Sequence, residues 1–365
     1  MVCEHECTVM IDSIGTASLR NAVAVAHGLR LAVDEAVRAI YRAPAVLTVA
    51  PTRAVADKLC TFLRDLGFEA SVGEAVAAPA GLRPIELLDV ALHLRDPLKT
   101  FDAAAAIAEF CGIGEAAALK LVTEPPSIVL GGVSRATVDA LAHRLEGLDA
   151  ELIASNPETA HFDLFAAGLP ATVHARLCRE LIAAGQAVPE AAGVVATGLP
   201  HGFADALWRK YGRTGAVRMV DRAFLRFDLV LDGLSPGFAA SAEQAETLDT
   251  LFGVPAEMLG TLIAEAPVTL ACDLRYGEFE PLLAQLAEVG LAARATLSTF
   301  QSVALEIASA RDTEAVGAEM AALGMLDERV TLPCTTMAMP VSMARMVRAR
   351  LEAAGAEVWT AGAAA

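Results

Sequence analysis

Apolar and polar positions along this chain repeat one pattern five times. In the first copy, a short apolar run at Thr8 to Ile11 predicts a strand, and apolar positions three and four apart predict helices at Ala17 to His27 and Asp34 to Tyr41. A second strand at Ala45 to Val49, a third helix and a closing strand at Phe68 to Val72 complete the copy. The expected element order is β-α-α-β-α-β.

The third helix of the copy has the clearest start and end signals, which together we call its frame. Thr52 opens it with a side chain that can accept a bond from a free amide of the first turn, and Gly67 closes it because glycine tolerates a left-handed backbone. An apolar stripe at helical spacing lies between them and predicts one buried face; it consists of Val55, Leu59, Phe62, Leu63 and Leu66.

The same frame returns further along the chain. Ser134 and Asp149, and then Arg275 and Gly290, repeat the opener and the closer at equal spacing. The second strand follows a proline in each full copy, and proline cannot continue the preceding helix; these prolines are Pro44, Pro125 and Pro267. Residues 1–75, 84–156 and 224–299 therefore read as full modules.

Two further copies are shortened and lack a full second helix. They occupy residues 160–222 and 302–361, with Gly212 and Gly355 as the expected closers. In the last copy we expect strands at Val303 to Ile307 and Thr335 to Met339. The predicted fold class is α+β, with tandem small modules that each form a three-stranded sheet covered by two or three helices.

This unit resembles the C-terminal domain of the bacterial ribosomal stalk protein, whose fold the ClpS adaptor shares. The resemblance rests on Thr8 to Val72, Leu87 to Ile153 and Phe227 to Leu297. Within the second stretch, Val133-Ser134-Arg135-Ala136-Thr137 is similar to the start of the stalk domain's last helix. The resemblance implies a small module of stalk-domain fold.

No partner carries over from that resemblance. The stalk domain recruits translation GTPases through a lysine-rich face on its second and third helices. The second helices of this chain mix acids with few bases; they carry Asp34, Glu35, Arg38 and Arg42, then Glu115 and Lys120, then Glu257 and Glu265. The acid and histidine constellation of the ClpS peptide pocket is also missing from the sequence.

Composition and charge narrow the class of protein. The 365 residues are 55% hydrophobic, with much alanine, which favours a packed and soluble chain over a disordered one. No apolar run reaches the roughly 20 residues of a membrane span, and Met1 to Cys7 is unlike a secretory signal, so we expect a cytoplasmic protein without membrane insertion. The net charge of −17 disfavours nucleic-acid partners.

Groups that could carry chemistry are few. The seven cysteines are scattered, and Cys3, His5 and Cys7 lack the spacing of a structural zinc site. A soft cluster could be core, a partner surface or a Cu(I) site; its members are Cys334, Met337, Met339, Met343 and Met346. Gly131-Gly132 before Ser134 reads as a tight turn because it lacks the lysine of a phosphate loop.

Polar residues on the first strands are the remaining candidates for a site between modules. They are Asp12, His93, Asp163, Asp228 and Glu306. The sequence otherwise predicts no catalytic, cofactor or metal residue and no enzyme. It favours a non-catalytic interaction or scaffold protein, a subunit or adaptor of a larger assembly whose partners are proteins, including a second copy of the chain. The alternatives are an enzyme or small-molecule binder with a site between modules, and a translation-linked factor-binding protein.

Overall fold

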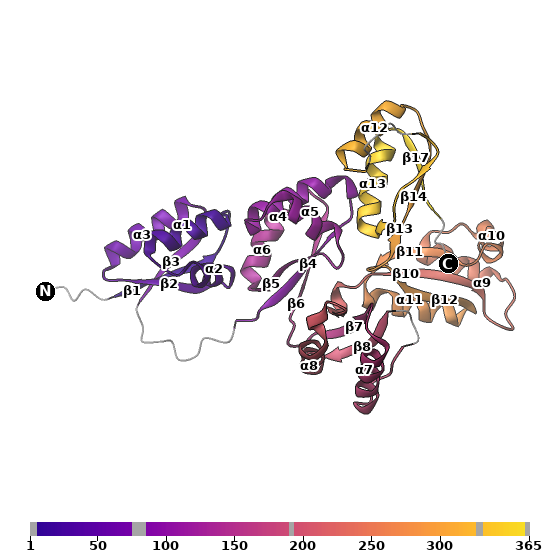
Figure 1. The fold of residues 1–365 in the computed structure, drawn as a ribbon, viewed down its shortest axis with the longest axis horizontal. Coiled ribbons are helices and arrows are strands. Elements are labelled where there is room, and N and C mark those ends of the chain that lie inside the picture. The colour runs from indigo at the N-terminus through magenta and orange to yellow at the C-terminus, as the bar shows by residue number, and fades with distance from the viewer. Residues whose placement is uncertain (1–5, 75–84, 190–192, 326–330, 362–365) are drawn as a thin grey trace. The chain divides into compact units, whose positions relative to one another are not determined.

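The computed structural model describes residues 6–74, 85–189, 193–325 and 331–361. The chain divides into two compact units, which are described separately (Figure 1). Unit 1 consists of Met1–Pro157, Ala304–Met337 and Ser342–Ala365, and unit 2 of Glu158–Val303 and Ala338–Val341. Unit 1 contains modules 1, 2 and 5, and unit 2 contains modules 3 and 4. The predicted α+β class with small repeated sheets is confirmed.

Modules 1 and 2 have the full element order. Module 1 consists of β1 (Cys7–Ser13), α1 (Leu19–Leu29), α2 (Val33–Tyr41), β2 (Ala45–Ala50), α3 (Arg53–Asp65) and β3 (Glu69–Glu74). Module 2 consists of β4 (Leu88–Leu94), η1 (Pro97–Lys99), α4 (Thr100–Cys111), α5 (Glu115–Thr123), β5 (Ile128–Val133), α6 (Arg135–Arg144) and β6 (Ala150–Ser155). The antiparallel sheets have the orders β2-β1-β3 and β5-β4-β6, so the first strand is central in both.

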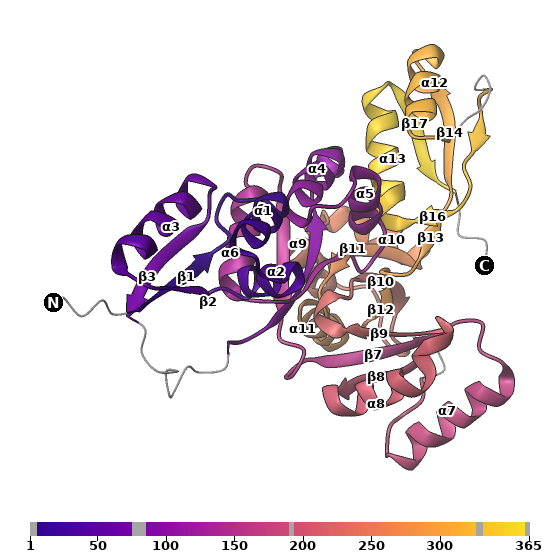
Figure 2. The same cartoon turned by 60° about the vertical axis from the view of Figure 1, so that its left-hand side comes forward.

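Module 5 completes unit 1 and has one helix fewer. It consists of β14 (Leu305–Ala310), α12 (Thr313–Ala322), β15 (Cys334–Thr335), α13 (Val341–Ala353) and β17 (Ala356–Thr360), in the sheet order β15-β14-β17. Both helices lie on one side of the strands (Figure 2).

Unit 2 repeats the arrangement twice. Module 3 consists of β7 (His161–Ala166), α7 (Ala171–Ala183), β8 (Val194–Pro200), α8 (His201–Tyr211), η2 (Gly212–Thr214), β9 (Val217–Asp221) and η3 (Arg222–Phe224). Module 4 consists of β10 (Phe227–Leu234), α9 (Ala242–Phe252), η4 (Ala256–Met258), α10 (Leu259–Ala264), β11 (Val268–Leu274), α11 (Tyr276–Glu288) and β12 (Leu291–Leu297). The sheet orders are β8-β7-β9 and β11-β10-β12. No helix in the described part of the chain has the length and apolar character needed to cross a membrane.

In module 1 the third helix forms for the reasons that the sequence indicates, whereas Ser134, which opens α6 in module 2, makes no side-chain cap hydrogen bond. Thr52 accepts a hydrogen bond from the Val55 amide at the start of α3, and Gly67 has a φ of +94° after its end. Asp149 and Gly355, the closers of two other modules, also have positive φ. Gly212 also follows directly after its helix, α8, but with a φ of −72° rather than a left-handed backbone. It begins the short helix η2, and Gly215 takes the left-handed backbone three residues later.

The predicted strand Thr335 to Met339 is also wrong. This segment is divided between β15 and β16 (Met339–Pro340), which belong to different sheets. β16 pairs with β13 (Ser302–Val303), so the predicted strand Val303 to Ile307 is likewise split between β13 and β14. The chain passes from one unit to the other at both breaks, which explains why neither strand continues.

A bulge beside the central strand recurs in modules 2, 3 and 4. In each of these modules the second strand (β5, β8 or β11) carries extra residues opposite the central strand. One of these residues has a φ between +58° and +69°, and its amide donates a hydrogen bond to an aspartate on the central strand. The three pairs are Asp89 with Gly132 at 2.9 Å, Asp163 with Gly198 at 2.7 Å and Asp228 with Asp273 at 3.1 Å. The aspartate thus replaces the partner that a bulged amide loses in the ladder. Gly131 and Gly132 lie inside β5, not in the predicted turn.

In module 3 the aspartate of this bulge also forms an ion pair with an arginine. Arg222 donates through Nε to Asp163 Oδ1 at 3.0 Å, and the Asp163 side chain is 6% exposed. The Arg222 guanidinium lies 4.0 Å from the ring centroid of Tyr276 in module 4. Asp163 therefore fixes the bulge and also the arginine that joins two modules of unit 2.

We predict that Asp163→Ala lowers the free energy of unfolding of unit 2 by about 3 kcal/mol, because it leaves Arg222 with an uncompensated charge in a largely buried position. Asp205→Ala, which removes the exposed Asp205–Arg209 pair of α8, should change it by less than about 0.5 kcal/mol. Urea unfolding followed by the fluorescence of Trp208, in a Trp359→Phe background, measures both. Equal effects of the two substitutions would contradict the assignment.

Candidate interaction site between the first two modules

Modules 1 and 2 share one hydrophobic core. A single cluster of buried side chains runs from Val9, Ile11 and Leu63 of module 1 to Val90 and Leu141 of module 2. Interiors of this kind are close-packed and resist sliding. The two modules therefore form one body, and the surfaces along their seam have a fixed geometry.

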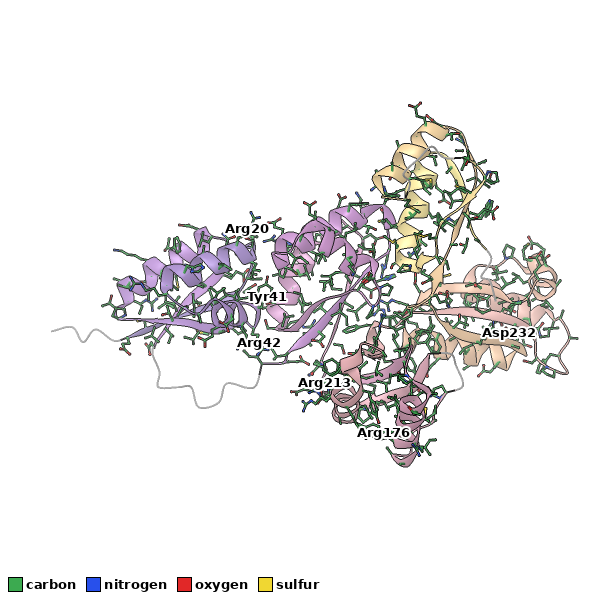
Figure 3. The ribbon with its side chains drawn as sticks, in the orientation of Figure 1. Arg20, Tyr41, Arg42, Arg176, Arg213 and Asp232 are labelled. Atoms are coloured by element: carbon green, nitrogen blue, oxygen red, sulfur yellow. The ribbon has the colours of Figure 1, made fainter. Side chains whose placement is uncertain are left out.

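The C-terminal end of α2 forms one side of the seam. The Tyr41 carbonyl, which has no donor within its own helix, accepts bonds from Ser134 N at 3.1 Å and Thr137 Oγ1 at 2.8 Å. The Tyr41 hydroxyl donates to the Phe110 carbonyl at 2.5 Å, and the two rings meet edge to face with centroids 5.8 Å apart. Arg42 Nε donates to the Gly132 carbonyl at 3.1 Å. Tyr41 and Arg42 lie where module 1 meets module 2 (Figure 3).

Arg144 of α6 forms the other side. Its guanidinium donates to the carbonyls of Thr16 and Ala17 in module 1 and pairs with Glu109 at 3.3 Å. The side chain is only 15% exposed. Arg144 could not be singled out from the sequence, because its main-chain partners Thr16 and Ala17 are more than a hundred residues away.

A groove opens between α2 and the edge strand β5. Its volume is about 420 Å³, within the usual range of ligand sites. The apolar lining comes from both modules: Leu19, Val37, Cys111, Val129, Leu130 and Val133. Arg38 and Arg42 are the only charged residues in the lining, which is completed by Tyr41, Gly131 and Gly132.

The structure does not gather the five candidate residues of the first strands. Each lies in a different module, and two separate cavities in the described part of the chain contain one of them each, Asp12 in one and His93 in the other. Asp12 accepts from Ser71, whereas Asp163 and Asp228 hold bulges. Glu306 lies on β14, opposite Thr335 and Trp359.

The soft-metal candidates are dispersed as well. Among the described residues, no group of three or more His, Cys, Asp or Glu side chains is placed to hold a metal ion. Cys3 and His5 fall outside the described residues, and Cys7 is buried in β1. Met346 is a core residue of module 5, while Met337 is 88% exposed.

Two arginines near the end of the described chain, Arg348 and Arg350, are paired with acidic residues. Arg348 pairs with Glu352 at 2.7 Å, and Arg350 pairs with Glu319 while its guanidinium lies 4.6 Å from the Phe101 ring centroid. Their charge is therefore used within unit 1.

Comparison with known proteins adds no assignment. A scan against protein-family models, a search of curated proteins and a search of solved structures each found no match. The functional case rests on the geometry of the chain itself.

Tyr41 gives the seam a measurable pH dependence. Burial raises the pKa of the Tyr41 hydroxyl well above its ordinary value of about 10; the nearby Cys111 adds to the rise and Arg144 opposes it. The folded state therefore favours the protonated hydroxyl. The stability that this provides is complete below about pH 10 and is lost progressively as the pH rises beyond it.

We predict that Tyr41→Phe lowers the free energy of unfolding of unit 1 by about 1.5 kcal/mol at pH 8, because the Phe110 carbonyl loses its donor. The difference between the wild type and the variant should shrink progressively as the pH rises above about 10. Urea unfolding followed by circular dichroism at several pH values checks this. A difference that is constant with pH would show that the hydroxyl is not buried in the seam.

Proposed function

We propose that this chain is a non-catalytic scaffold or adaptor in the cytoplasm, which binds protein partners and acts as a subunit of a larger assembly. The observation that carries the proposal is the shared core of modules 1 and 2, with its groove along an open strand edge. A fixed apolar groove beside exposed main-chain groups suits recognition of another polypeptide.

The repeated sheets extend this capacity along the chain. Each three-stranded sheet has its first strand in the middle, so each module has two edge strands. Edge strands carry main-chain groups that another chain can pair with. Several weak contacts on one chain bind a multivalent partner more tightly than any one of them alone. The element order also supports a relationship of the modules to the stalk C-terminal domain, which we include in the proposal.

Both tryptophans of the sequence are about half exposed. Trp208 on α8 is 48% exposed, and Trp359 on the edge strand β17 is 55% exposed. Tryptophan is enriched among the residues that dominate binding energy at protein interfaces. Their exposure in two different modules supports contact sites on both units.

We predict that the tagged full-length chain, purified gently from its native host, elutes as a defined complex by light scattering and mass spectrometry. Trp359→Ala should reduce recovery of the partner at least about fivefold, since an interface tryptophan commonly contributes more than about 1 kcal/mol. Ile182→Ala is the control, because Ile182 is 62% exposed yet lies on a helix rather than an edge strand. A monomer that recovers no partner would contradict the proposal.

The volume of the α2–β5 groove also favours a second candidate, a small-molecule binder. A ligand that binds only the folded state raises the unfolding temperature. A metabolite screen by thermal shift, repeated on Val37→Glu to block the groove, separates this candidate from the scaffold.

A further inference from the structure

We propose that the α2–β5 groove binds an extended acidic segment of a partner protein, which adds to the free edge of β5 as a further strand. This inference rests on the proposed scaffold function and specifies the chemistry of its ligand. Main-chain bonds to β5 would provide affinity, and Arg38 and Arg42 would select carboxylate side chains.

The strand edge is available along most of β5. β5 pairs with β4 on one side, and no third strand pairs with it among the described residues. At the C-terminal end of β5 the edge is blocked by contacts with module 1, because Arg42 donates to the Gly132 carbonyl and Ser134 N donates to the Tyr41 carbonyl. Within the remaining stretch, Cys111 Sγ donates to the Val129 carbonyl at 3.9 Å. Apart from this one weak contact, the edge of Ile128 to Gly131 remains for pairing, over a length of about 13 Å at 3.3 Å per residue.

The helix α2 provides the opposite wall. Val37 and Tyr41 are one helical turn apart and both line the groove, with Arg38 next to Val37. Leu19 and Cys111 add apolar surface from α1 and α4. A strand laid between α2 and β5 would place alternate side chains against this apolar lining, which is the arrangement of strand addition in a groove between a helix and a sheet edge.

The charge of the groove opposes that of the chain. The whole sequence has 45 acidic and 28 basic residues, yet the only charged residues in this lining are two arginines. Arg38 is exposed and makes no ion pair within the described part of the chain. Arg42 bonds a main-chain carbonyl through Nε and likewise has no carboxylate partner there. Both guanidinium groups can therefore donate hydrogen bonds to a carboxylate.

Gly132 keeps the groove open beside Arg42, while Gly131 faces Asp89 of the central strand. An added Cβ at Gly132 would lie 3.5 Å from Arg42 Nη2, and one at Gly131 would lie 3.3 Å from Asp89 Oδ1. Any side chain at position 132 would occupy the space beside Arg42. The absence of side chains lets another backbone approach.

The direct test uses two fluorescent heptapeptides, one of alternating valine and glutamate and one of alternating valine and lysine. The full-length chain has a net charge of −17, so non-specific attraction favours the lysine peptide. Fluorescence anisotropy at 0.15 M salt should instead show at least about fivefold tighter binding of the glutamate peptide. Equal binding, or tighter binding of the lysine peptide, would overturn the proposal.

Charge-reversal variants locate the effect. Arg38→Glu should weaken binding of the glutamate peptide about tenfold, because it replaces an attraction with a repulsion and breaks no internal contact. Arg213→Glu in module 3 makes the same change in net charge at an exposed position in unit 2 and should leave binding within about twofold (Figure 3). Equal losses in the two variants would also overturn the proposal.

Hydrogen exchange tests the strand addition itself. Saturating glutamate peptide should slow amide exchange at Ile128 to Gly131 and leave the edge strand β17 unchanged. Binding without protection of β5 would contradict pairing at this edge. Purification of the Arg38→Glu chain from the host separates the two proposals: a complex recovered from it, together with failure of the peptide tests, would overturn the groove and leave the scaffold function standing.

Discussion

A three-stranded sheet with its first strand in the middle is the constraint on which this structure depends. Such a sheet buries one face under its helices, but it is too small to bury much surface and leaves an open edge on each side. Modules 1 and 2 resolve the first difficulty by joining their cores. The open edges remain, and they provide the surfaces on which the proposed function depends.

The joint between these modules satisfies polar groups as well as apolar ones. The last carbonyls of α2 and α4 would lack donors, and they receive them from Ser134, Thr137 and the Tyr41 hydroxyl. In modules 2, 3 and 4 an aspartate side chain likewise accepts a hydrogen bond from a main-chain amide that the bulge leaves without a partner. Unsatisfied main-chain groups thus account for several of the buried and half-buried polar side chains.

Local features of the fold could be predicted from the sequence, and contacts distant in sequence could not. The cap at Thr52 and the closer at Gly67 depend on residues within one helix, so the pattern revealed them. The bulge at Gly132 depends on Asp89, 43 positions away, and Arg144 contacts Thr16 across 128 positions. The groove was missed for the same reason, because α2 and β5 belong to different modules. The local signal of it was the presence of two arginines four residues apart, Arg38 in α2 and Arg42 directly after its end.

The central claim is that modules 1 and 2 unfold as one body. Native-state hydrogen exchange measures this directly, since amides in a single cooperative unit open with one free energy. The account predicts the same opening free energy for Val9 and Ile11 of module 1 and for Val90 and Ile107 of module 2, with an equal decrease at all four in Tyr41→Ala. Two different free energies, or a decrease confined to module 1, would contradict it.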